Sequence, residues 1–112
     1  MTAPSLQVRQ TVYVRAQGCC ERCGASAYGG ALHHRRPRGM GGSRRPETNR
    51  PANLILLDEA CHLTIESPRD MARACGWLVR QTQDPACVPV LTVHGWVFLD
   101  DEGGYQPVEV SA

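Results

Sequence analysis

Short blocks of regularly spaced hydrophobic residues run along the 112-residue chain and are separated by glycine, proline and small polar residues. Residues 5–17 place apolar side chains at rough helical spacing and are followed by Gly18, which predicts a helix that ends at this glycine. Residues 31–35 follow a glycine turn and predict a short strand. Residues 53–57 are almost entirely apolar and predict a second, buried strand.

Two further helices are expected after the second predicted strand. Residues 59–66 form the first of them. Ser67 and Pro68 then have the residue types of a helix N-terminus, with a capping hydroxyl followed by proline at the first helical position. A second helix should therefore run from Pro68 to about Cys75.

The C-terminal part of the chain has the alternating pattern of β structure. Residues 90–93 and 96–99 predict a hairpin, and a further strand is expected after the acidic turn that follows it. The predicted fold class is therefore α+β. We expect residues 1–86 to form one domain and residues 87–112 to form a C-terminal β-hairpin extension packed on the same domain.

The positive charges are unevenly distributed along the chain, although its formal net charge is only +1. All twelve basic residues are arginines, and six of them lie between residues 33 and 50, mostly in a glycine- and proline-rich stretch typical of a long exposed loop. Guanidinium groups suit bidentate phosphate contacts, although a lysine-free chain equally fits a GC-rich genome. The arginines expected to contact nucleic acid are Arg35, Arg36, Arg38, Arg44 and Arg45.

Cysteine spacing and hydropathy constrain the compartment and the chemistry. No stretch approaches the ~20 consecutive apolar residues of a membrane span, and the N-terminal residues lack the apolar segment of a signal peptide. We therefore expect a cytosolic protein without a membrane partner, in which six cysteines are thiols or metal ligands rather than disulfides. Cys20 and Cys23 form a C-x-x-C motif followed by Gly24, the form of a metal-binding knuckle.

Histidines and an asparagine follow this knuckle in a fixed order. The motif residues are Cys20 and Cys23, then His33-His34-Arg35-Arg36-Pro37, then Asn53 at the start of the buried strand, then Cys61-His62. In this order they resemble the HNH endonuclease family, whose ββα-metal fold is a strand, loop, strand, helix unit. The similarity covers residues 15 to about 79, with a motif core at 19–79. Residues 33–42 are most similar to small HNH proteins of actinobacterial phages and prophages.

The resemblance implies a role for each of these polar residues. His33 and His62 would hold one divalent cation, which could be Mg, Mn, Ni or Zn. His34 would be the general base that takes a proton from the attacking water, and Asn53 would fix the loop and orient His34. Adjacent strand residues point to opposite faces, which agrees with one histidine binding metal while its neighbour faces water.

The function implied by the resemblance is metal-dependent hydrolysis of DNA phosphodiester bonds, leaving 5′-phosphate and 3′-hydroxyl ends. DNA is the implied partner. Because some phage HNH proteins assist the terminase that packages DNA, packaging proteins are a second partner class, in the cytoplasm of a bacterial host. Two alternatives stay open: a zinc-ribbon-like DNA-binding accessory protein that does not cut, and an RNA-directed nuclease or toxin. The three histidines favour the enzyme.

The knuckle departs from the family pattern at one position. HNH proteins with a structural zinc commonly have a second C-x-x-C before the helix histidine, but this chain has Asp58 three residues before Cys61. Because a carboxylate oxygen is an acceptable zinc ligand, Cys20, Cys23, Cys61 and Asp58 can together form a zinc site, with Cys19 as a substitute fourth ligand. The other alternative is that zinc has been lost and that Cys61 only packs in the core.

Overall fold

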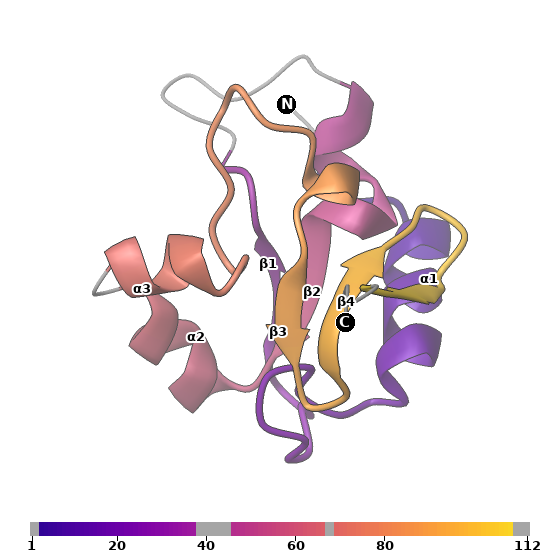
Figure 1. Cartoon of the computed structure of the whole chain (residues 1–112). Helices are drawn as coiled ribbons and strands as arrows, with labels where there is room; N and C mark the ends of the chain where they lie inside the picture. Colours follow the sequence, from indigo (N-terminus) through magenta and orange to yellow (C-terminus); the bar gives the residue numbers. More distant parts are fainter. Residues whose placement is uncertain (1–2, 38–45, 67–68, 109–112) are drawn as a thin grey trace.

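The protein is a small α+β domain with two antiparallel sheets (Figure 1). The computed structural model describes residues 3–37, 46–66 and 69–108. The elements in chain order are α1 (Leu6–Ala16), β1 (Ala31–His34), the 3-10 turns η1 (Pro46–Asn49) and η2 (Pro51–Asn53), β2 (Leu54–Leu57), α2 (Glu59–Ile65), α3 (Arg69–Ala74), the 3-10 turn η3 (Pro85–Cys87), β3 (Val90–Thr92), β4 (Gly95–Leu99) and β5 (Tyr105–Pro107).

The described elements follow the predicted ones closely. Each predicted helix and strand has an observed counterpart, and most of the boundaries agree to within about two residues. The predicted helix start at Ser67 and Pro68 lies outside the described residues. Within the part of the chain that the structure describes, no helix combines the length and the apolar character needed to cross a membrane.

Side-chain caps determine where α1 and α2 begin. The Ser5 hydroxyl accepts a hydrogen bond from the backbone N–H of Val8 at 3.2 Å, and the Asp58 carboxylate accepts one from the N–H of Cys61 at 2.7 Å. Both contacts satisfy a backbone donor that has no partner within the helix. Asp58 therefore fixes the first turn of α2, next to the cysteine that this turn carries.

Strands β1 and β2 form an antiparallel pair in which His33 lies opposite Ile55 and His34 lies opposite Leu54. All four residues of β2 are buried, because the strand has a core on each face. Leu54 and Leu56 pack toward α1, whereas Ile55 and Leu57 belong to the larger core. This two-sided burial explains the uninterrupted apolar run in the sequence.

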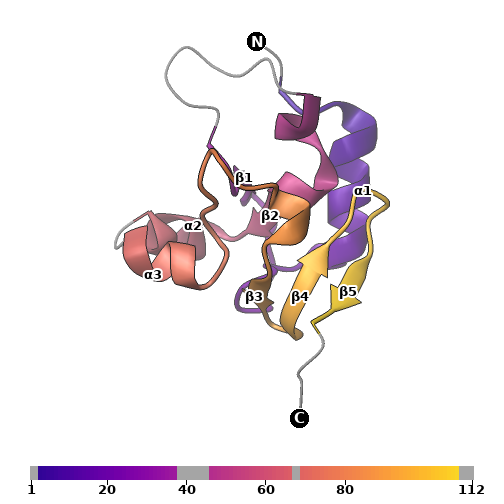
Figure 2. The ribbon, with the colours of Figure 1, turned by 45° about the horizontal axis from the view of Figure 1, so that its top comes forward.

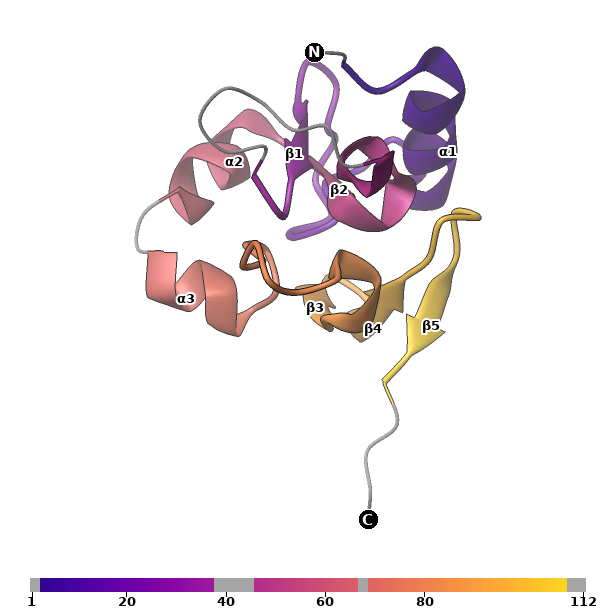
Figure 3. The same ribbon diagram turned by 90° about the horizontal axis from the view of Figure 1, so that it is seen from above.

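Helices cover the β1–β2 pair from two sides. Seen from above, α2 and α3 lie on one side of the pair and α1 lies on the other (Figure 3). The helix α2 follows β2 directly, so the chain forms a strand, loop, strand, helix unit. This order places the end of β1 beside α2, and the candidate site lies between them.

The C-terminal strands form a separate sheet with the order β3-β4-β5 (Figure 2). Val90, Val97 and Leu99 of this sheet belong to the same buried cluster as Leu57 and Trp77. The C-terminal strands and the strand, loop, strand, helix unit therefore share one hydrophobic core.

Candidate functional site

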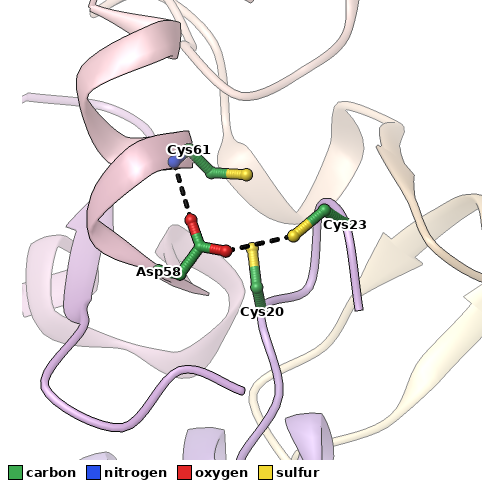
Figure 4. Close-up of side chains that lie close together, drawn as sticks. All are labelled: Cys20, Cys23, Asp58 and Cys61. Atoms are coloured by element: carbon green, nitrogen blue, oxygen red, sulfur yellow. Dashed lines mark hydrogen bonds between the residues drawn. The ribbon is translucent and has the colours of Figure 1, made fainter. Parts of the chain in front are cut away.

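Three thiols and one carboxylate come together where the knuckle meets the start of α2. The Sγ atoms of Cys20, Cys23 and Cys61 and a carboxylate oxygen of Asp58 all lie within 4.8 Å of one another (Figure 4). Cys20 and Cys61 are buried, Asp58 is partly exposed and Cys23 is exposed. The structure therefore brings together all four residues that the sequence proposed as one ligand set.

The backbone of the knuckle explains why a glycine follows the C-x-x-C motif. Gly24 has a φ of 84°, which lies in the left-handed region, and its N–H donates to the carbonyl oxygen of Cys20 at 2.8 Å. The N–H of Cys20 donates in turn to the carbonyl oxygen of Ala25 at 2.6 Å. This tight turn holds Cys20 and Cys23 on the same side of the loop.

Hydrogen bonds already link the members of the cluster. The Cys23 thiol donates to Asp58 Oδ2 at 3.1 Å, and a guanidinium nitrogen of Arg22 lies 3.2 Å from the Cys61 sulfur. The backbone N–H of Cys61 and the Cys23 thiol lower the pKa of Asp58. Burial raises the pKa of Cys61 to about 12, whereas at Cys20 hydrogen bonds from nearby backbone groups outweigh burial and lower the pKa.

This donor set suits a metal ion. Thiolates are soft ligands that select zinc among the common divalent ions, and a carboxylate oxygen is an accepted fourth ligand. Cys19 is not a member of the group, because its thiol lies 3.6 Å from the carbonyl oxygen of Gln17 and outside the cluster. Asp58, rather than Cys19, therefore completes the cluster.

Three histidines line a single cleft of about 520 Å³ between the end of β1 and α2. His33 and His34 come from β1 and His62 comes from α2, while Glu66 and Arg69 line the same cleft. The rings of His33 and His62 meet edge to face, with centroids 5.3 Å apart and an angle of 63° between their planes. The fold thus gathers side chains that are far apart in the sequence.

The two histidines that face each other have different surroundings. His33 Nε2 lies 2.9 Å from the carbonyl oxygen of Trp77, so this nitrogen donates and Nδ1 carries the lone pair. Burial lowers the pKa of His33 to about 4, which keeps the ring neutral at physiological pH. His62 is less enclosed, and its Nε2 lies 3.8 Å from a carboxylate oxygen of Glu66.

The structure confirms that Asn53 holds the loop but corrects the expectation that it also contacts His34. Its Oδ1 accepts the N–H of Arg36 at 2.7 Å, and its Nδ2 donates to the carbonyl oxygens of Arg36 and Thr48 at 3.2 and 2.9 Å. Asn53 therefore joins the two described ends of the loop, but its amide does not contact His34. His34 Nε2 instead lies 2.8 Å from Oδ1 of Asn49, a residue that the sequence analysis did not single out.

The structure also corrects the expectation that Arg35 contacts nucleic acid, because the side chain of Arg35 is completely buried. Its guanidinium donates to four backbone carbonyl oxygens at 2.8–2.9 Å, those of Gly76, Ala52, Pro85 and Val88. Burial, together with the positive charge of Arg15, lowers the pKa of Arg35 to about 9, so the group stays charged at neutral pH. The expectation that Arg35 contacts phosphate is wrong, since each of its three guanidinium nitrogens donates to a backbone carbonyl oxygen of the protein.

The other four arginines that were expected to contact phosphate are either buried or outside the described residues. Arg36 is only 5% exposed, and one of its guanidinium nitrogens donates to the carbonyl oxygen of Gln83 at 2.8 Å. Arg38, Arg44 and Arg45 lie outside the described residues. Among the described residues that line the histidine cleft, the only arginine is Arg69, which the sequence analysis overlooked. Its place in the sequence, three residues after Glu66 and directly after the predicted helix start at Ser67 and Pro68, was the available signal.

No family model matches the chain, and no matching curated protein or solved structure was found. The resemblance to HNH endonucleases therefore depends on the motif residues and their order. Two features of the structure bear on function: a cluster of cysteines and an aspartate that can hold a metal ion, and a cleft lined by three histidines.

Proposed function

We propose that the protein is a metal-dependent endonuclease of the HNH type that hydrolyses DNA phosphodiester bonds. The observation that carries this proposal is the convergence of His33, His34 and His62 on one cleft, beside the arginine Arg69. A cleft with imidazoles and a guanidinium offers ligands for a divalent ion, a base for water and a cation for phosphate.

His33 and His62 are the residues that would hold the catalytic ion. Their rings are close enough for one nitrogen of each to approach a common ion at the ~2.0–2.1 Å typical of zinc-imidazole bonds. The hydrogen bond from His33 Nε2 to the Trp77 carbonyl fits this role, because ligating histidines usually donate their second N–H to such a partner. When bound, a divalent ion stabilises the charge that develops on the phosphate and the leaving oxygen.

The remaining cleft residues supply the other parts of the reaction. His34, in its neutral form, takes the proton of a water that attacks the phosphorus atom. Arg69 binds a phosphate oxygen on the cleft wall, and Arg38, Arg44 and Arg45 add contacts that do not depend on the base sequence. A carboxylate oxygen of Glu66 lies 3.8 Å from Nε2 of His62, beyond hydrogen-bond distance, and pairs with that ring only when the ring is protonated.

We further propose that Cys20, Cys23, Cys61 and Asp58 hold a structural zinc. A zinc at this position would tie the knuckle after α1 to the first turn of α2, which carries His62. The ion would then stabilise the wall of the histidine cleft without taking part in hydrolysis. If the protein is phage-encoded, the DNA-packaging terminase is the proposed partner, in the bacterial cytoplasm.

A nicking assay on supercoiled plasmid with Mg²⁺, Mn²⁺, Ni²⁺ or Zn²⁺ tests the nuclease proposal. We expect the wild-type protein to nick the plasmid with at least one ion and His34→Ala to be slower by about 10²- to 10⁴-fold, the usual contribution of a general base. His94→Ala is the matched control, because His94 is exposed on the β3–β4 turn. It should nick like the wild type.

The chemistry of the ends provides a second criterion. DNA ligase should reseal the nicked product directly, since attack of water on phosphorus breaks the bond to the 3′-oxygen and leaves a 5′-phosphate and a 3′-hydroxyl. Nicks that need end repair before sealing would contradict the mechanism, as would equal nicking by wild type and His34→Ala. DNA binding without nicking under every metal would instead support the non-cutting accessory protein.

A further inference from the structure

The side chain of Asn49 is the only partner within hydrogen-bond distance of the His34 ring among the described residues, with Oδ1 lying 2.8 Å from Nε2. We infer that Asn49 is a positioning residue that fixes the tautomer and orientation of His34. The consequence for catalysis rests on the proposed nuclease function, whereas the effect on the tautomer does not.

The chemistry of the two groups determines where the proton lies. An amide oxygen only accepts hydrogen bonds, so His34 Nε2 must carry the proton that fills this 2.8 Å contact. The lone pair of the neutral ring then lies on Nδ1, and Nδ1 has no hydrogen-bond partner among the described residues. Because His34 lines the cleft, Nδ1 is the atom that can take a proton from water there.

The backbone on both sides of Asn49 is held in place by Asn53. The Asn53 side chain donates to the carbonyl oxygen of Thr48, and its backbone N–H donates to the carbonyl oxygen of Arg50 at 2.9 Å. Asn49 lies between these two anchored residues, at the end of η1. Asn53 therefore holds the turn, and Asn49 holds the imidazole.

A second link ties this turn to the strand that carries the histidine. The N–H of Arg35 donates to the carbonyl oxygen of Asn53 at 2.8 Å, directly after His34. The ring and the amide that binds it are thus built on backbone segments that hydrogen-bond to each other. Because the two backbone segments are fixed relative to each other, they hold the His34 ring and the Asn49 amide within hydrogen-bond distance.

Asn49 is not among the described residues that line the cleft. Its substitution should therefore alter the orientation and tautomer of the His34 imidazole and leave contacts with the substrate intact. Asn49→Ala removes the acceptor and frees both the ring torsion and the tautomer. Asn49→Asp retains an oxygen acceptor at the same position, so it should keep the proton of the neutral ring on Nε2. The two variants therefore separate loss of the acceptor from the mere replacement of Asn49.

Two-bond ¹H–¹⁵N correlation spectra of the ¹⁵N-labelled full chain report the tautomer of each histidine. We expect neutral His34 to carry its proton on Nε2 in the wild type and in Asn49→Asp, and to become a mixture of tautomers in Asn49→Ala. Gln10→Ala, on the exposed side of α1, is the matched amide-removal control and should leave the spectrum unchanged. A proton on Nδ1 in the wild type, or no change in Asn49→Ala, would overturn the inference.

Nicking kinetics then test the catalytic consequence. Asn49→Ala should lower kcat by about 10- to 100-fold, as loss of an orienting partner typically does, with KM unchanged. Asn49→Asp retains an oxygen acceptor and should therefore keep more of the wild-type kcat than Asn49→Ala. Equal losses of kcat in the two variants, or a loss that appears in KM instead of kcat, would contradict positioning. If the wild type does not nick DNA, the nuclease proposal fails, and the spectra alone decide the role of Asn49.

Discussion

Glu21 forms a two-point ion pair with Arg15 inside the protein. The two carboxylate oxygens accept hydrogen bonds at 2.7 and 2.9 Å, and each side chain is only 1% exposed. Glu21 also accepts hydrogen bonds from the N–H of Leu56 at 2.9 Å and from the Tyr105 hydroxyl at 2.6 Å. This network connects α1, the knuckle, β2 and β5, so it links the two sheets through buried polar contacts.

Substitution of Arg15 by methionine should strongly destabilise the protein. The change leaves the Glu21 carboxylate buried without its counter-charge, which typically costs about 3–5 kcal/mol in the free energy of unfolding. Arg9→Met on the exposed side of the same helix is the matched control and should change this free energy by less than about 0.5 kcal/mol. Urea unfolding curves give both values. Equal midpoints for the two variants would show that the buried pair is not needed for stability.

Asp100 should make folding stability depend on pH in the acid range. Hydrogen bonds from the Gln106 side chain and the Gly104 N–H, at 2.8 and 2.7 Å, lower the pKa of this carboxyl in the folded protein. Its contribution is therefore present above the unfolded pKa of about 3.9 and is lost as the pH falls through the lower folded value.

The test compares urea unfolding of the wild type and Asp100→Asn between pH 7 and pH 2. The difference in unfolding free energy between the two proteins should be largest at neutral pH and should shrink as the wild-type carboxyl becomes protonated. Asp70→Asn, which removes an exposed carboxylate on α3, is the matched control. A constant difference across the whole range would refute the linkage.

Local patterns were sufficient to predict most of the fold. Helical spacing and the glycine that follows it predicted α1, and the apolar run predicted β2, because these signals come from neighbouring residues. The cysteine and aspartate cluster was also predicted: the C-x-x-C spacing indicated Cys20 and Cys23, and the resemblance to HNH proteins implied Cys61 and Asp58.

The residues that the sequence did not assign depend on long-range contacts. Arg35 sits in a basic run typical of a phosphate-binding loop, but its guanidinium binds carbonyl groups from segments as distant as Val88. Asn49 reaches His34 only because the end of η1 lies beside the end of β1. Neither contact leaves a periodic or spacing signal, so only the tertiary structure could reveal it.

Arg69 should contribute to DNA affinity without contributing to stability. It is exposed on α3 and lines the histidine cleft, so Arg69→Ala should weaken DNA binding and lower the slope of log affinity against log salt by roughly one. Arg80→Ala, an exposed arginine outside that cleft, is the control and should retain the wild-type slope. Fluorescence anisotropy with labelled duplex DNA at several salt concentrations measures both. Identical slopes for the two variants would remove Arg69 from the binding surface.

Asp58 has two roles that substitution can separate. As the cap of α2 it accepts the N–H of Cys61, and as the fourth member of the cluster it offers a negative oxygen ligand. Asparagine is also a good helix cap, so Asp58→Asn should leave α2 intact while it weakens zinc binding. Because a direct ligand is lost, we expect the loss in zinc affinity to exceed the roughly 10- to 100-fold that loss of an outer partner costs.

The opposite substitution, Asp58→Cys, creates a site with four cysteines and should bind zinc more tightly than the wild type, although α2 loses its cap. Competition with a chromophoric zinc chelator under reducing conditions ranks the affinities. Asp84→Asn is the matched control, because Asp84 caps η3 through the N–H of Ala86 and lies outside the cluster. If Asp58→Asn binds zinc as tightly as the wild type, Asp58 is not a ligand and serves only as the cap.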